Sequence, residues 1–229
     1  MRLLWTAAGF LAAICLPILL ITTNVRGAFN SLRLYEYGFN KYAVSLSTGM
    51  DKGELRKAAN GWIDYLNSKE ELIAVRVVIR GEERELFNQR EVAHLKDVKG
   101  LIQLDYRLQW ITLLYLLAYI GVGLAWKRRA FLPDLAKSLT AGSALTLAIV
   151  AAVGIGSLLD FAALFYQFHL LSFSNELWQL DPSRDYLIRL FPESFQYDFT
   201  LFLAGATLVE ALVIGGIAGA YWARRGKHN

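Results

Sequence analysis

Residues 3–25 read LLWTAAGFLAAICLPILLITTNV and contain no Asp, Glu, Lys or Arg. A helix needs about 20 consecutive apolar residues to cross the hydrocarbon core of a bilayer, so this run is long enough for one crossing. Three similar runs follow farther along the chain. The sequence therefore predicts an α-helical integral membrane protein with four transmembrane helices, over residues 3–22, 108–126, 138–161 and 199–222.

The composition of the whole chain agrees with this interpretation. Of its 229 residues, 55% are hydrophobic and 19% are charged, and the mean hydropathy is +0.34, which excludes an intrinsically disordered chain. Basic residues beside the apolar runs explain the net charge of +4, so no nucleic-acid partner is expected. Cys15 is the only cysteine, which excludes an intramolecular disulfide and a multi-cysteine zinc site.

The first apolar run also has some features of a cleaved signal peptide. Arg2 precedes it, and residues 11–15 resemble a lipoprotein processing box. Such a box needs a small residue directly before the cysteine, whereas Ile14 is bulky, and the apolar run continues through Ile21. We therefore interpret it as a membrane-spanning helix.

The charges between the predicted helices set their orientation. Basic residues predominate in the loop 127–137 and in the tail 223–229, as expected of cytoplasmic segments. Both termini are therefore predicted to be cytoplasmic. Residues 26–107, with 14 basic and 12 acidic side chains, then form a nearly neutral extracytoplasmic cap, and residues 165–198 form a second extracytoplasmic segment.

Short patterns in residues 26–107 predict a small α+β cap. Asp51, three residues before Glu54, has the spacing of a helix cap. Residues 73–79 are rich in β-branched side chains, and Gly81 allows a turn into residues 85–87, which predicts a hairpin.

His94 is the first candidate for chemistry. Asn88, three residues before Glu91, predicts a second helix cap, so His94 is placed on a short helix running through Val98. Glu91 and Asp97 are each three residues from His94, and a carboxylate there can orient the ring and raise its basicity. The alternative is a solvated surface histidine.

His169 is the second candidate and directly follows the third predicted span. Its neighbours are aromatic residues and leucines without any charge, a setting that keeps an imidazole neutral and able to accept a proton. The alternative is a residue of the aromatic belt at the membrane interface. The third histidine, His228, lies in the basic tail and is expected to be solvated.

Other catalytic patterns are weak or missing in the sequence. A zinc site would need Glu91 or Asp97 beside the two histidines, and we expect neither a metal nor a cofactor. There is no Gly-rich phosphate loop and no Gly-x-Ser-x-Gly elbow, and Cys15 lies within a span. Glu210, near the middle of the fourth span, is expected to be a buried and protonated structural carboxyl. Histidine-assisted chemistry on a lipid-like substrate at the outer leaflet remains.

Several sequence blocks resemble one family of membrane enzymes. They are EVAHLKDVK at 91–99, FH at 168–169, NELWQLDP at 175–182, FPE at 191–193, YEY at 35–37 and TG at 48–49. These blocks and the four-span layout resemble the bacterial lipoprotein intramolecular transacylase family, called Lit. The paired histidine blocks are the specific part of this resemblance.

The resemblance implies a bacterial cell-membrane enzyme with four transmembrane helices under an extracellular cap. It implies that His94 and His169 are catalytic, at the boundary between cap and membrane. The implied substrate is a diacylated lipoprotein, and no obligate protein partner is implied. The implied reaction moves the sn-2 acyl chain of the diacylglyceryl group to the α-amino group of the N-terminal cysteine, giving a lyso-form lipoprotein.

This chemistry requires no protein nucleophile, because amine and ester belong to the same substrate molecule. One histidine removes a proton from the attacking amine and the other protonates the departing oxygen. We favour His169 as the base and His94 as the acid, oriented by Asp97 and supported by Glu91. The reverse assignment stays open at this point.

Further side chains are predicted to line the substrate site: Tyr35, Tyr37, Phe168, Trp178 and Asp181. For the aromatic ones, anchoring at the membrane interface is the alternative. Two other functions also stay open. One is a non-enzymatic membrane protein whose cap binds a metal or a partner through the two histidines, and the other is acyl transfer from a phospholipid donor.

Overall fold

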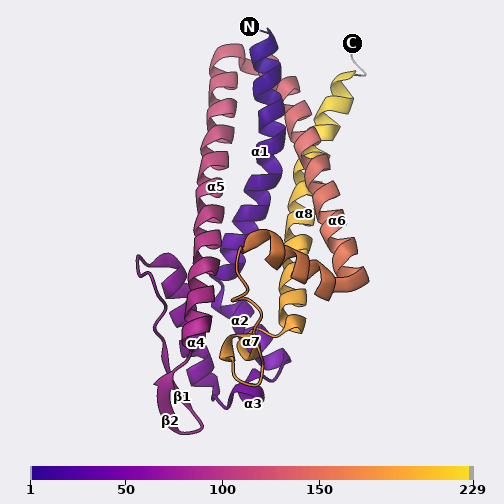
Figure 1. Cartoon of the computed structure of the whole chain (residues 1–229). Coiled ribbons are helices and arrows are strands. Elements are labelled where there is room, and N and C mark those ends of the chain that lie inside the picture. The colour runs from indigo at the N-terminus through magenta and orange to yellow at the C-terminus, as the bar shows by residue number, and fades with distance from the viewer. Residues whose placement is uncertain (1, 227–229) are drawn as a thin grey trace. The chain divides into compact units, whose positions relative to one another are not determined.

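The computed structural model describes residues 2–226, most of which are helical (Figure 1). The elements in chain order are α1 (Arg2–Phe29), α2 (Leu32–Lys41), α3 (Val44–Thr48), α4 (Lys52–Asn67), β1 (Arg76–Ile79), β2 (Glu82–Glu85), α5 (Gln89–Lys127), the 3-10 helix η1 (Arg128–Phe131), α6 (Leu132–Ser172), α7 (Tyr186–Leu190) and α8 (Glu193–Gly226). The chain divides into two compact units, which we describe separately. The first unit comprises residues 2–25, 105–156 and 201–226, and the second comprises residues 26–104 and 157–200.

Three helical stretches are long and apolar enough to cross a membrane. They are Leu3–Phe29, Gln89–Ser172 and Glu193–Arg224, and the second of them contains α5, η1 and α6. The protein is thus mainly helical with membrane-spanning character and one small sheet among its described residues, as the sequence predicted. The helices extend beyond the predicted spans, because hydropathy marks the apolar stretch and not the end of helical hydrogen bonding.

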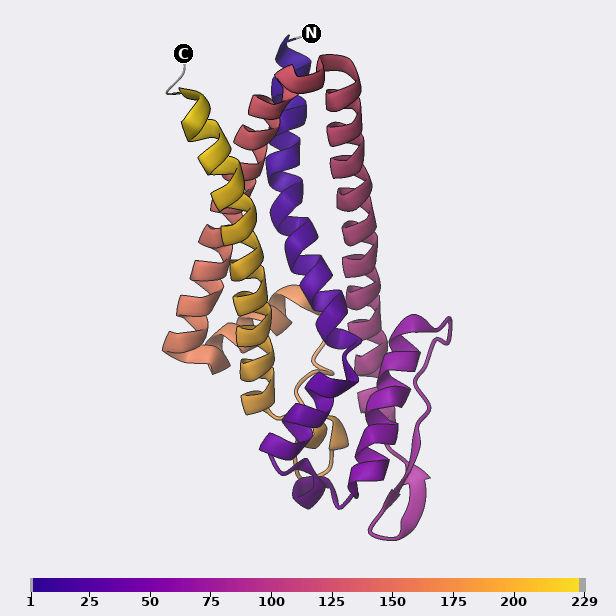
Figure 2. The same ribbon diagram turned by 180° about the vertical axis from the view of Figure 1, so that it is seen from behind.

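Apolar helix faces pack together in the first unit. Both ribbon views show α1 alongside α5, and the Tyr115 hydroxyl donates a hydrogen bond to the carbonyl of Ala8 at 2.8 Å (Figures 1 and 2). The buried core of this unit consists of Ala12, Cys15, Leu16, Leu20, Leu116, Tyr119, Phe131 and Ala211. On α8, Glu210 accepts a hydrogen bond from the Asn24 side chain at 2.8 Å, so this half-buried carboxyl has a neutral partner. Its protonation state stays a prediction.

The second unit has an aromatic core. Tyr35 on α2 contacts Phe191 and Phe195, and Phe39 contacts Phe191, with ring centroids 5.7 to 6.4 Å apart. The helix α4 packs on α2, and its N-terminus is capped as predicted, with the Asp51 carboxylate accepting a hydrogen bond from the amide of Glu54 at 2.9 Å. The local cap pattern in the sequence therefore predicted the start of this helix correctly.

The predicted hairpin forms, but its first strand is shorter than expected and its second strand lies earlier in the chain. Strands β1 and β2 pair antiparallel, with Ile79 opposite Glu82, so the turn contains only Arg80 and Gly81. Both turn residues have positive φ, at 53° and 89°, which suits a two-residue hairpin. The second strand was predicted at residues 85–87 but lies at Glu82–Glu85, because all four of its residues are charged and give no hydrophobic signal.

Two long helices differ from expectation. The short helix predicted around His94 and the second span form one helix, α5, because no proline interrupts residues 89–127. Helix α6 continues to Ser172 but breaks at Asp160, where φ is −159° and ψ is 90°. The Asp160 carboxylate accepts a hydrogen bond from the amide of Ala163 at 2.9 Å, so it caps a new helical segment, residues 161–172.

Candidate active site

His94 is held in the second turn of α5 by a reciprocal cap. The Asn88 side chain accepts a hydrogen bond from the amide of Glu91 at 3.1 Å, and the Glu91 carboxylate accepts one from the amide of Asn88 at 2.8 Å. This is the capping box that the sequence predicted. The cap starts the helix one turn before His94 and so fixes the direction of its side chain.

His169 lies on the helical segment that begins at the Asp160 break. Its Nδ1 lies 2.7 Å from the carbonyl oxygen of Phe165, one turn earlier. Because a carbonyl oxygen only accepts hydrogen bonds, Nδ1 must donate its proton to it. In the neutral ring, the lone pair is then on Nε2, which is the form that accepts a proton.

The fold of the second unit brings the two histidines together. Their ring centroids are 6.3 Å apart, with 32° between the ring planes. Only 5% of His94 and 8% of His169 is exposed. Among the described residues, no carboxylate forms an ion pair with either ring, and Nδ1 of His94 is buried without a hydrogen-bond partner. Burial lowers the pKa of both imidazoles, that of His94 to about 4 despite the nearby Asp97 carboxylate, and so favours the neutral form of both rings.

Aromatic side chains surround His169. Its ring centroid lies 4.4 Å from Phe165, 4.8 Å from Trp178, 5.4 Å from Phe168 and 5.6 Å from Phe173. We call these four residues the aromatic cage. The Phe173 ring also lies 5.2 Å from His94, so it contacts both histidines.

The segment that carries Trp178 is held by α5. The Arg90 guanidinium donates hydrogen bonds to the carbonyls of Glu176 at 2.8 Å and Gln179 at 2.9 Å, on either side of Trp178. Three residues after His94, the Asp97 carboxylate accepts a hydrogen bond from the Asn175 side chain at 2.8 Å. The helix that positions His94 therefore also positions the aromatic residue beside His169.

The two carboxylates expected to orient His94 have other partners. The expected hydrogen bond from the His94 ring to the Asp97 carboxylate is absent, because Asp97 accepts from Asn175 instead. Glu91 is fully buried, and its second oxygen accepts a hydrogen bond from the amide of Leu187 at 2.6 Å. Both carboxylates connect α5 to the segment after α6 instead of contacting the imidazole, because they point to faces of α5 that are covered by that segment.

The predicted substrate-lining residues are not all close to the histidines. Phe168 and Trp178 belong to the aromatic cage. Tyr35 is 2% exposed, and its hydroxyl donates to the carbonyl of Phe29 and accepts from Trp62, which makes it a core residue.

The other two predicted residues have structural partners. The Tyr37 hydroxyl donates a hydrogen bond to Asp198 at 3.2 Å. Asp181 belongs to a turn, where the hydrogen bond from the amide of Ser183, at 2.8 Å, lowers the pKa of its carboxyl. Neither of these contacts involves a histidine.

Sequence reasoning missed several residues at this site: Phe165, Phe173, Asn175, Arg90 and Asp185. Asp185 is 1% exposed and accepts a hydrogen bond from the Asn88 side chain at 2.8 Å, so it adds to the support of the α5 N-terminus. Phe165 had a detectable signal, since it precedes His169 by one helical turn. Phe173 had the same signal, since it follows His169 by one turn, whereas Asn175, Arg90 and Asp185 depend on contacts between distant segments and leave no local pattern.

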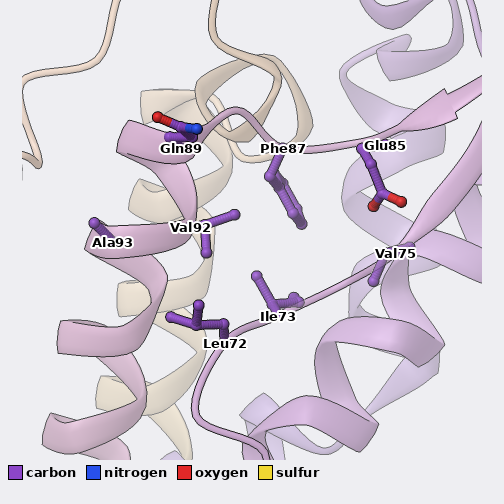
Figure 3. A pocket seen from close by; sticks show the side chains of 8 residues that line it. All are labelled: Leu72, Ile73, Val75, Glu85, Phe87, Gln89, Val92 and Ala93. Carbon is purple, nitrogen blue, oxygen red and sulfur yellow. The ribbon is translucent and has the colours of Figure 1, made fainter.

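A separate pocket of about 460 Å³ lies between the hairpin and α5 (Figure 3). Its lining consists of Leu72, Ile73, Val75, Glu85, Phe87, Gln89, Val92 and Ala93. Neither histidine lines it.

The described part of the chain contains no group of three or more His, Cys, Asp and Glu residues arranged to hold a metal ion. His228 lies outside the described residues.

Comparisons with solved structures agree on the fold. The chain is similar to the membrane integral lipoprotein intramolecular transacylase Lit from Bacillus cereus, with a TM-score of 0.83, 19% identity and 100% of both chains covered. Two variants of that protein, each with one histidine replaced, match at 19% identity with TM-scores of 0.75 and 0.74. They cover 99% and 98% of this chain, and 95% and 93% of theirs.

Comparisons of sequence identify the family. No curated protein matches the chain significantly. The family model for Lipoprotein intramolecular transacylase Lit matches residues 10–196, which is most of the chain. With its apolar helices and its paired histidines, the chain therefore belongs to the Lit family of lipoprotein intramolecular transacylases.

Proposed function

We propose that this protein moves the sn-2 acyl chain of a diacylated lipoprotein to the α-amino group of the lipoprotein's own N-terminal cysteine. The observation that carries the proposal is the buried pair of His94 and His169, 6.3 Å apart, in a member of the Lit family. The product is a lyso-form lipoprotein with an N-acyl chain and one remaining ester-linked chain.

The reaction exchanges an ester for an amide. The amine nitrogen attacks the carbonyl carbon of the sn-2 ester, the new C–N bond forms, and the bond from that carbon to the glyceryl oxygen breaks. The nitrogen loses one proton and the departing oxygen gains one, so no water or external donor is consumed. Tethering both groups in one substrate leaves the enzyme with two tasks, orientation and proton transfer.

His169 is the base in this proposal. Its Nδ1 donates to the Phe165 carbonyl, which leaves the Nε2 lone pair free to take the amine proton. His94 is then the acid that protonates the glyceryl oxygen. Because both buried rings are neutral in the resting site, the proton that His169 takes from the amine passes to His94, whose ring centroid is 6.3 Å away, and His94 delivers it to the glyceryl oxygen. Both rings are then neutral again after the turnover.

The location is part of the same proposal. Four crossings by α1, α5, α6 and α8, with both termini in the cytoplasm, put residues 26–107 and 165–198 outside the cell membrane. His94 and His169 then lie at the outer leaflet, where a lipoprotein's acylated N-terminus is anchored. The bilayer and the lipoprotein are the partners that this arrangement requires.

The test is expression in a bacterial host that lacks lipoprotein N-acylation, followed by mass spectrometry of the N-terminal lipopeptide. The unsubstituted protein is expected to shift one acyl chain from glyceryl to nitrogen at constant total mass. His94→Ala and His169→Ala are each expected to lower conversion at least about 100-fold, since each general acid or base contributes roughly 10²–10⁴-fold.

His228→Ala is the matched control and is expected to convert normally. Full conversion by either of the other two variants would contradict the two-histidine mechanism. Isotope-labelled phospholipid identifies the acyl donor. If the lipoprotein itself carries no label, label in its N-acyl chain would mean that the chain came from a phospholipid molecule. Loss of conversion in a chelator would favour a metal site instead.

A further inference from the structure

The aromatic cage leaves His169 without a charged partner. Four rings lie within 5.6 Å of its centroid, and its one hydrogen bond goes to a backbone carbonyl. Among the described residues, no carboxylate pairs with it. A base that accepts a proton becomes an imidazolium, and a buried cation is unfavourable unless nearby groups stabilise it.

Trp178 has the geometry to stabilise this cation. Its ring plane is tilted by 31° from that of His169, and the centroids are 4.8 Å apart, so the two rings are in contact and closer to parallel than to edge-to-face. The face of an indole carries the negative part of its quadrupole, and Trp binds cations better than Tyr or Phe does. Phe165 and Phe168 meet His169 at 84° and 81°, and Phe173 is tilted by 40° at 5.6 Å, so Trp178 is the least tilted ring of the cage and lies closer than Phe173.

The orientation of Trp178 is well supported. The Tyr166 ring packs against it at 5.3 Å in an edge-to-face arrangement, and Arg90 holds the backbone on both sides of it. A fixed indole needs no reorganisation when the charge appears, which is the condition for electrostatic stabilisation of a transition state.

We propose that Trp178 lowers the barrier of acyl transfer by cation–π stabilisation of the His169 imidazolium. This inference rests on the proposed function, and it adds a role to a residue otherwise explained as a wall of the substrate site. Trp178 acts through His169, so it is a positioning residue and not a catalytic one. The stabilisation is stronger in the transition state than in the resting enzyme, because only there does the ring carry charge.

Fluorination of the indole tests this without changing the shape of the site. Each fluorine withdraws electron density from the ring face and weakens cation–π attraction, while the side chain stays nearly isosteric. We would replace Trp178 with 5-fluoro-, 5,7-difluoro- and 5,6,7-trifluorotryptophan in the full chain and measure kcat and KM for lyso-form production. The expected result is a stepwise fall of kcat, by roughly tenfold over the series, with KM unchanged.

The same series at Trp62 is the matched control. Trp62 belongs to the second unit as well and is buried, but its indole N–H donates to the Tyr35 hydroxyl and no ring contact joins it to either histidine. Its fluorination is expected to leave kcat unchanged. A structural role of Trp178 alone predicts no trend at all, because packing does not follow fluorine content.

Two outcomes overturn the inference while leaving the proposed function intact. A flat kcat series at Trp178 would mean that its ring face does not stabilise charge. A rising series would mean that the indole N–H acts as a hydrogen-bond donor, since fluorination makes that proton more acidic. Absence of lyso-form lipoprotein from the unsubstituted protein would instead overturn the proposed function itself, and this inference with it.

Discussion

At the scale of single residues, the two histidines are held by different means. His169 obtains its tautomer from its own helix, through the carbonyl of Phe165 one turn earlier. His94 has no such partner, and its position follows from the capping box of Asn88 and Glu91 at the start of α5. The support of His94 therefore depends on a buried carboxylate that does not touch it.

Glu91→Gln tests that support. Both carboxylate oxygens of Glu91 accept backbone hydrogen bonds, from Asn88 and Leu187, and the side chain is fully buried. Glutamine has only one acceptor oxygen, so at least one buried amide loses its partner, which costs about 1–3 kcal/mol. We expect the variant to unfold at a lower midpoint in detergent, as measured by tryptophan fluorescence, and to catalyse acyl transfer more slowly.

Glu82→Gln is the control for this substitution. Glu82 lies on β2, and its side chain is 82% exposed and 3.8 Å from Arg84. Its replacement is expected to change stability by less than about 0.5 kcal/mol. Equal unfolding midpoints for the two variants would show that Glu91 does not support the α5 N-terminus.

At the scale of elements, the close approach of α2 and α8 determines the packing of the second unit. A Cβ added at Gly38 would lie 2.2 Å from two ring atoms of Phe195, whose side chain is 2% exposed. The absence of a side chain on α2 at this point is what admits the Phe195 ring into the aromatic core.

Gly38→Ala is therefore expected to destabilise the protein by about 1–3 kcal/mol, because a buried ring has to move. Gly100→Ala on α5 is the matched control, since a Cβ there meets nothing within 4 Å. That change is expected to be neutral or to stabilise by up to about 1 kcal/mol through helix propensity. Thermal unfolding of both variants in the same detergent tests this. An unchanged unfolding temperature for Gly38→Ala would contradict the packing argument.

The break in α6 is the other decisive feature at this scale. An unbroken helix would keep residues 161–172 along the direction of the preceding span. The non-helical backbone of Asp160 and its cap on Ala163 start a new segment, and His169 lies on that segment. Hydropathy ended the predicted third span at residue 161 and gave no sign that a helix follows the break.

At the scale of the whole molecule, the predicted topology is accessible to labelling. We expect Glu83→Cys and Ser183→Cys to react with a membrane-impermeant maleimide in intact cells, because four crossings place both outside. Arg129→Cys, in the turn between α5 and α6, is expected to react only after permeabilisation. All three side chains are exposed, so burial does not limit the reaction.

The unsubstituted protein provides the background, because its one cysteine, Cys15, is 7% exposed. Reaction of Arg129→Cys in intact cells would contradict cytoplasmic placement of that loop. Protection of Glu83→Cys or Ser183→Cys would contradict an extracytoplasmic site for the two histidines.

Features whose free energies are local could be predicted from the amino-acid sequence. Runs of apolar residues require a nonpolar solvent, and caps such as Asp51 with Glu54 satisfy backbone groups only three residues away. The blocks around His94 and His169 also sufficed to indicate the Lit family, which the family model confirms.

Which of these residues contact one another depends on how the chain packs in three dimensions. His94 and His169 are 75 positions apart, and their contact depends on the hydrogen bonds that join α5 to the segment after α6. The same packing assigned Asp97 to Asn175 and made Tyr35 a core residue. Contacts of this kind depend on how segments far apart in the sequence pack together. The spacing of residues along one helix or strand does not predict them.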